Sequence, residues 1–73
     1  GMSMFHFTRI FAELVGMPPH RYLLKARLTA ARSMLLQGRS VTETCYACGF
    51  RNLSHFTRSF ARRYGFSPSQ LTA

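Results

Sequence analysis

The chain has 73 residues, enough for one small domain, and it is strongly basic. It contains ten Lys and Arg residues but only two acidic residues, Glu13 and Glu43, which gives a net charge of +8. No apolar run approaches the ~20 residues of a membrane span, so we do not expect a transmembrane protein. Paired-carboxylate hydrolysis needs two carboxylates that face each other, and we do not expect such a pair from the only two acidic residues of the chain, so we do not expect an enzyme. Charge carried almost wholly by arginine is typical of a protein that binds nucleic acid.

Residues 4–15 are expected to form the first helix, because Ser3 is a good N-cap and apolar side chains follow at helical spacing. Positions spaced i, i+3, i+4 and i+7 share one helix face, and we expect that face to point inward. These positions are Phe7, Ile10, Phe11 and Leu14. The opposite face carries Phe5, Thr8, Arg9 and Ala12.

A long second helix is expected from Pro19 to about Gln37, where Gly38 ends it. At about 1.5 Å per residue, this helix is ~27 Å long. Further apolar residues widen its main stripe, so we expect the helix to be sandwiched between two neighbours. The main stripe consists of Leu24, Leu28, Ala31 and Leu35.

Residues 40–43 read SVTE, a capping box, so a short third helix begins there and ends at Gly49. Cys45 and Cys48 fall on its inward face and form a Cys-x-x-Cys pair. A zinc site needs four ligands, and the three histidines have no paired spacing, so we expect neither a metal nor a cofactor. Buried core thiols are the favoured interpretation, and a thiol sensor is the alternative.

The fourth helix is expected from Leu53 to Tyr64, capped by Asn52, with Phe56 and Phe60 pointing inward. A last helix begins at Pro68. No long stretch alternates with a period of two, so the predicted fold class is all-α. A short helix, a turn with glycine and a second helix with polar outward residues match the helix-turn-helix plan.

An internal repeat is the most informative feature of the sequence. Residues 6–22 read HFTRIFAELVGMPPHRY and residues 55–71 read HFTRSFARRYGFSPSQL, with eight identities in seventeen positions. This agreement far exceeds chance and indicates a duplicated unit. The first copy matches only the second helix of a helix-turn-helix.

The segment GFRNLSHFTRSFARRYGFSPSQL closely resembles the signature of the AraC/XylS family of bacterial transcription regulators. The resemblance covers essentially the whole chain and implies two helix-turn-helix units on either side of a long linker helix. Residues 1–73 are then one DNA-binding domain: 1–18 hold the recognition helix of an incomplete first unit, 19–38 the linker helix, and 40–73 the second unit with the C-terminal helix. Each recognition helix is expected to enter one of two successive major-groove segments.

The resemblance and the helical wheel together predict the DNA contacts, while Arg27 in mid-linker is expected to have an internal structural role. Arg9 and Arg58 occupy equivalent positions in the repeat and are expected to read guanine edges or to hold phosphates. Asn52 is also the predicted N-cap. The expected DNA-binding residues are Met4, Phe5, Thr8, Arg9, Arg51, Asn52, Ser54, His55, Thr57 and Arg58. Weaker phosphate contacts are expected from Ser3, Arg62 and Arg63.

The resemblance also implies the biological setting. It implies a transcription regulator, of the activator type, in the bacterial cytoplasm and associated with the nucleoid. Double-stranded DNA is the expected partner, RNA polymerase is a second one, and no membrane is expected. We expect an effector-binding and dimerisation domain to lie outside this chain. The alternative functions are a cationic amphipathic membrane-active protein and a thiol-sensing helical protein.

Overall fold

The computed structural model describes residues 1–72, and every regular element in that range is helical. The order of elements is α1 (Met4–Val15), α2 (Pro19–Leu36), α3 (Val41–Ala47), α4 (Leu53–Tyr64) and a single 3-10 turn, η1 (Pro68–Leu71). The all-α prediction is confirmed. The predicted last helix is only this 3-10 turn, and Ala73, which closes the predicted domain, lies outside the described residues.

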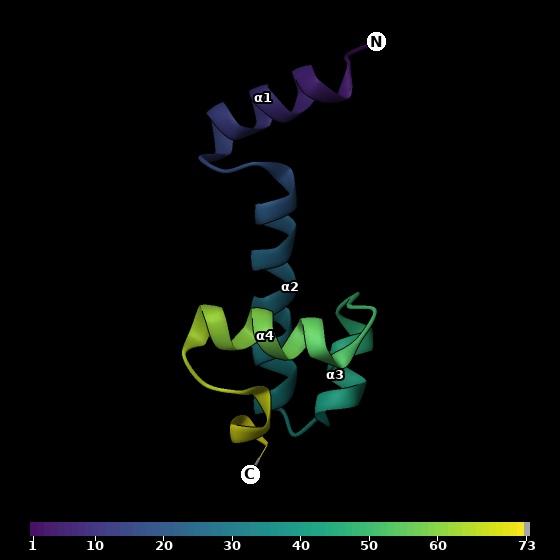
Figure 1. Cartoon of the computed structure of the whole chain (residues 1–73), viewed down its shortest axis with the longest axis vertical. Helices are drawn as coiled ribbons and strands as arrows, with labels where there is room; N and C mark the ends of the chain where they lie inside the picture. The colour runs from purple at the N-terminus through teal and green to yellow at the C-terminus, as the bar shows by residue number, and fades with distance from the viewer. Residues whose placement is uncertain (73) are drawn as a thin grey trace.

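The molecule is elongated, with extents of 47 × 20 × 20 Å. Helix α2 forms the central rod, α1 lies across its N-terminal end, and α3, α4 and η1 gather around its C-terminal half (Figure 1). The 18 residues of α2 give it a length of about 27 Å at the standard helical rise. The rod therefore holds α1 at a fixed separation from the group of α3, α4 and η1.

The core lies at the C-terminal half of α2. Leu28, Ala31 and Leu35 are buried there, as the apolar stripe predicted, and they pack with Phe56 and Phe60 of α4. The rings of Phe56 and Phe60 are 5.8 Å apart, in an edge-to-face arrangement that aromatic pairs favour. The hydroxyl of Tyr64 donates to the carbonyl of Leu28 at 3.3 Å and ties the end of α4 to the rod.

Helix α1 does not have the buried face that its periodicity predicts. None of its residues is buried, and Leu14 and Phe7 are 82% and 44% exposed. Its one aromatic contact with the rod joins Phe11 to Tyr22, with ring centroids 5.7 Å apart. The prediction of an inward stripe is wrong for residues 1–72, because α2 meets only the end of α1 and no other described element covers it.

The rod is not sandwiched between two neighbours either. Tyr22, Leu23 and Leu36 are about half exposed, so one side of α2 remains open to solvent. The prediction from its wide apolar stripe is therefore wrong within the described residues. Periodicity indicates which side chains can be buried, but burial requires an element that packs against them.

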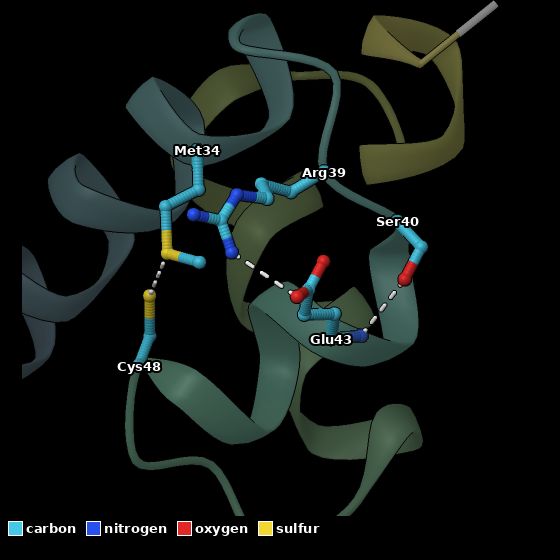
Figure 2. A network of polar contacts seen from close by, with 5 residues as sticks. All are labelled: Met34, Arg39, Ser40, Glu43 and Cys48. Atoms are coloured by element: carbon cyan, nitrogen blue, oxygen red, sulfur yellow. Dashed lines mark hydrogen bonds and ion pairs between the residues drawn. The ribbon is translucent and has the colours of Figure 1, made fainter.

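The helix ends follow the sequence closely, with one exception. Ser3, Ser40 and Asn52 cap α1, α3 and α4 through their side chains. The capping box predicted at residues 40–43 is only half formed: Ser40 Oγ accepts from the backbone N–H of Glu43 at 3.0 Å, but the carboxylate of Glu43 accepts from Arg39 at 3.1 Å instead of reaching back to Ser40 (Figure 2). A guanidinium next to the helix outcompetes the backbone N–H for that carboxylate.

Candidate nucleic-acid interface

Helices α3 and α4 form a helix-turn-helix around a glycine turn. Gly49 has φ +91°, a left-handed conformation that favours glycine, and it lets the chain reverse after α3. The next residue, Phe50, is 4% exposed, and its backbone N–H donates to the carbonyl of Cys45 at 3.1 Å. Phe50 therefore anchors the turn in the core and fixes where α4 begins.

The outward face of α4 is polar and lies opposite its buried phenylalanines. Ser54 and Arg58 are exposed, as the helical wheel predicts, whereas Thr57, predicted on the same outward face, is half-buried. Arg58 Nε donates to the carbonyl of Ser54 at 3.4 Å, so the guanidinium stem runs back along the helix. These three side chains and Leu53 line one shallow groove. Leu53 was missed by the sequence reasoning, which followed polar and charged side chains.

Three further predicted residues lie beside the first turn of α4. Asn52 Oδ1 accepts from the backbone N–H of His55 at 2.8 Å, which is the predicted cap. The His55 ring packs edge-on against Phe50, with centroids 5.6 Å apart, and remains exposed. Arg51 is exposed in the turn. The turn and the first turn of α4 therefore present these groups together at the positive end of the helix dipole.

Helix α1 presents its predicted residues at the other end of the rod. Met4 and Phe5 are each 78% exposed, while Thr8 is half-buried. Arg9 Nε lies 3.6 Å from Glu13 Oε1, and both side chains are exposed. An exposed ion pair of this kind contributes little and exchanges readily for another anion.

The predicted weaker phosphate residues are exposed as well. Ser3 Oγ is occupied by its cap, since it accepts from the backbone N–H of His6 at 3.0 Å. Arg62 and Arg63 lie in the last turn of α4, where positive charge complements the helix dipole. The guanidinium of Arg63 also lies 5.7 Å from the centre of the Tyr64 ring.

The electrostatic balance of the described residues leaves most arginines without a partner. Glu13 pairs with Arg9, and Glu43 pairs with Arg39, each within one i, i+4 spacing. No other ion pair forms among residues 1–72. The remaining guanidinium groups are therefore available to an external polyanion.

The two cysteines are free thiols in or near the core. Cys48 Sγ donates to the thioether sulfur of Met34 at 3.7 Å (Figure 2). Burial raises the pKa of the Cys48 thiol, and burial together with the neighbouring Cys48 raises the pKa of the Cys45 thiol. The thiolate is the reactive form, and a raised pKa lowers its fraction at neutral pH, so these thiols react more slowly there. This direction counts against the thiol-sensing alternative.

Residues 1–72 contain neither a metal-binding cluster nor a helix that could span a membrane. No three His, Cys, Asp or Glu side chains in this range gather where they would hold a metal ion. None of the helices described for these residues has the length and apolar character needed to cross a bilayer.

Comparison with known proteins identifies the fold. A family model described as a helix-turn-helix domain matches residues 1–73. The crystal structure of a probable AraC family transcriptional regulator from Rhodopseudomonas palustris superposes with a TM-score of 0.86, at 31% identity, over 99% of this chain and 69% of that one. The chain belongs to the AraC family of transcriptional regulators.

Curated AraC-family relatives agree with this assignment. A helix-turn-helix transcriptional regulator of Mycobacterium tuberculosis is 43% identical over 70 residues, covering 94% of this chain and 27% of the relative. The virulence regulon transcriptional activator VirF of Yersinia enterocolitica is 34% identical over 71 residues, covering 96% of this chain and 26% of the relative. The chain thus spans about a quarter of the length of these relatives and corresponds to their DNA-binding helix-turn-helix part.

The two copies of the repeat differ in how the helix after the glycine begins. Helix α2 begins at Pro19 with Pro18 at its N-cap, and no described side chain caps it. In the repeat copy Ser67 occupies the equivalent position, and it forms a capping box with Gln70. The start of the linker helix therefore relies on the fixed φ of two prolines rather than on a side-chain hydrogen bond.

Proposed function

We propose that this AraC-family domain binds double-stranded DNA sequence-specifically, with α1 and α4 as its recognition helices. The observation that carries the proposal is the division of α4 into two faces. Phe56 and Phe60 are fully buried against the rod, and Ser54 and Arg58 line an open groove on the other side. A helix held from behind in this way can place polar side chains against base edges in a major groove.

Both recognition helices are proposed to meet one duplex in successive major-groove segments, which recur about 34 Å apart. The 47 Å length of the molecule and the position of α1 and α4 at different levels of α2 suit this spacing (Figure 1). Within this domain, residues 1–18 act as the first reading element, 19–38 as the linker and 40–73 as the second unit.

The proposed base-edge contacts are made by one arginine from each recognition helix. Arg9 of α1 and Arg58 of α4 occupy equivalent repeat positions and are both exposed. The other proposed DNA-binding residues are Met4, Phe5, Thr8, Arg51, Asn52, Ser54, His55 and Thr57. Ser3, Arg62 and Arg63 are proposed as phosphate contacts.

For the whole protein, we propose transcription regulation of the activator type in the bacterial cytoplasm, at the nucleoid. Yersinia VirF is named a transcriptional activator, which supports that direction of control. RNA polymerase is proposed as the second macromolecular partner, and effector binding and dimerisation are proposed to belong to parts of the protein outside this chain. We assign no catalytic step to it.

The test is selection of bound duplexes from a randomised DNA pool, followed by binding assays with Arg9→Ala and Arg58→Ala. Each variant is expected to lose about 1–3 kcal/mol of binding free energy on the selected duplex and to become less selective for the base at one position of the motif. Arg32→Ala, at an exposed position of the rod, is the matched control and is expected to keep both affinity and motif. A pool that enriches no motif refutes sequence-specific binding. A loss that is equal on all duplexes shows phosphate contact instead of base reading.

A further inference from the structure

A cavity of about 450 Å³ lies between the rod and the turn that precedes α4. Its lining is polar and includes two guanidinium groups and an imidazole, but no carboxylate. The lining residues are Arg27, Gly49, Phe50, Arg51, Asn52 and His55. Such a lining is chemically suited to an oxyanion with several acceptor oxygens.

Arg27 is held in this cavity by its fit against the glycine turn. A Cβ atom at Gly49 would lie 3.0 Å from Arg27 Nε and 3.2 Å from Arg27 Cζ, so the guanidinium covers the space that any other side chain would fill. Arg27 is half-buried, and its guanidinium makes no hydrogen bond or ion pair with residues 1–72. A partly desolvated charge without a counter-ion is unfavourable, and an anion in the cavity would offset that cost.

The start of α4 supplies further donors next to the same cavity. Asn52 Oδ1 is occupied by the backbone N–H of His55, so it leaves the earlier N–H groups of the helix unfilled. The backbone N–H groups of Leu53 and Ser54 have no acceptor among residues 1–72. Free N–H groups and the positive end of the helix dipole favour an anion at this position.

We propose that this cavity binds a phosphate of the DNA backbone, and that Arg27 of α2, together with Arg51, clamps it at the edge of the groove that α4 enters. The inference rests on the proposed function, since the phosphates that flank a recognition helix lie beside its first turn. Arg27 thereby acts as a positioning residue: it sets the register of α4 on the duplex without reading a base.

The experiment compares Arg27→Gln with Arg32→Gln, a matched arginine on the exposed side of the same helix. Binding to the selected duplex and to a scrambled duplex is measured over a series of salt concentrations. Arg27→Gln is expected to weaken binding to both duplexes by about tenfold, and to reduce the slope of log K against log salt by about 0.9. Arg32→Gln is expected to leave the slope unchanged. Arg27→Lys, which keeps the charge, is expected to restore the slope.

Several outcomes overturn the inference. An unchanged slope for Arg27→Gln, with lower thermal stability of the free protein, assigns Arg27 a structural role only. If Arg27→Gln does not fold, Arg51→Gln is measured in its place, and an unchanged slope for Arg51→Gln overturns the proposed clamp. Inorganic phosphate is compared with chloride at equal ionic strength for its effect on the thermal stability of the wild type. If phosphate stabilises the wild type more, while Arg27→Gln leaves the salt slope of DNA binding unchanged, the cavity is a site for free anions and the inference is overturned. If the wild type shows no salt-dependent DNA binding at all, the proposed function itself is refuted, and this outcome is distinct from the failure of the Arg27 clamp.

Discussion

Replacement of Thr44 by valine should stabilise the domain. Thr44 of α3 is completely buried, and its hydroxyl has no hydrogen-bond partner among residues 1–72. A buried hydroxyl without a partner costs about 1–3 kcal/mol, because it has given up water and gained nothing in exchange. Valine has nearly the same shape and places a methyl group where the hydroxyl lies, so the substitution removes that cost without opening a cavity.

The free energy of unfolding is expected to rise by about 1–2 kcal/mol. This is less than the full cost of the buried hydroxyl, because the methyl group of valine packs slightly differently from the hydroxyl that it replaces. For a domain of this size, each kcal/mol corresponds to a shift of about 4–8 °C in Tm. Urea titration and thermal melts followed by far-ultraviolet circular dichroism measure both quantities. DNA affinity is expected to remain unchanged, because Thr44 does not reach the surface.

Thr42→Val is the matched control, since Thr42 lies on the same helix and is exposed. It is expected to change stability by less than about 0.5 kcal/mol, because the two residues have similar helix propensities. A Thr44→Val variant that is less stable than the wild type, next to a neutral Thr42→Val, refutes the reasoning. It means that the buried hydroxyl makes a hydrogen bond in solution.

Three further predictions concern the turn, the thiols and the first helix. Gly49→Ala should destabilise the domain by more than Gly16→Ala, because both glycines have positive φ but only a Cβ at Gly49 would meet a guanidinium. Equal losses of about 1–2 kcal/mol in the free energy of unfolding, measured by urea titration, contradict this prediction. Burial raises the pKa of Cys45 and Cys48, so alkylation of these thiols by iodoacetamide at neutral pH should be slower than alkylation of free cysteine. The free energy of unfolding should also fall as the pH rises above the ordinary thiol pKa, because the unfolded chain loses these protons at a lower pH than the folded one. Leu14→Gln should change the free energy of unfolding by less than about 0.5 kcal/mol, and a larger loss in thermal melts indicates that Leu14 is buried in solution.

Much of the candidate interface was accessible from the sequence. The repeat placed Arg9 and Arg58 in equivalent positions, and helical spacing put Ser54 and Arg58 on the face opposite Phe56, where the structure shows them exposed. The prediction for Arg27 could not foresee its place over the glycine turn, because nothing in the local pattern around it signals a cavity. That contact depends on how the rod packs against a turn far along the chain.

The sequence by itself determined where the helices lie. Caps such as Ser3 and Asn52 and apolar spacing act within one or two turns, so the order of residues is enough to specify them. Only the tertiary structure decided which apolar faces are covered and where Arg27 meets Gly49. Burial is set by which surfaces meet in three dimensions, and a periodic pattern contains no information about the surface that packs opposite.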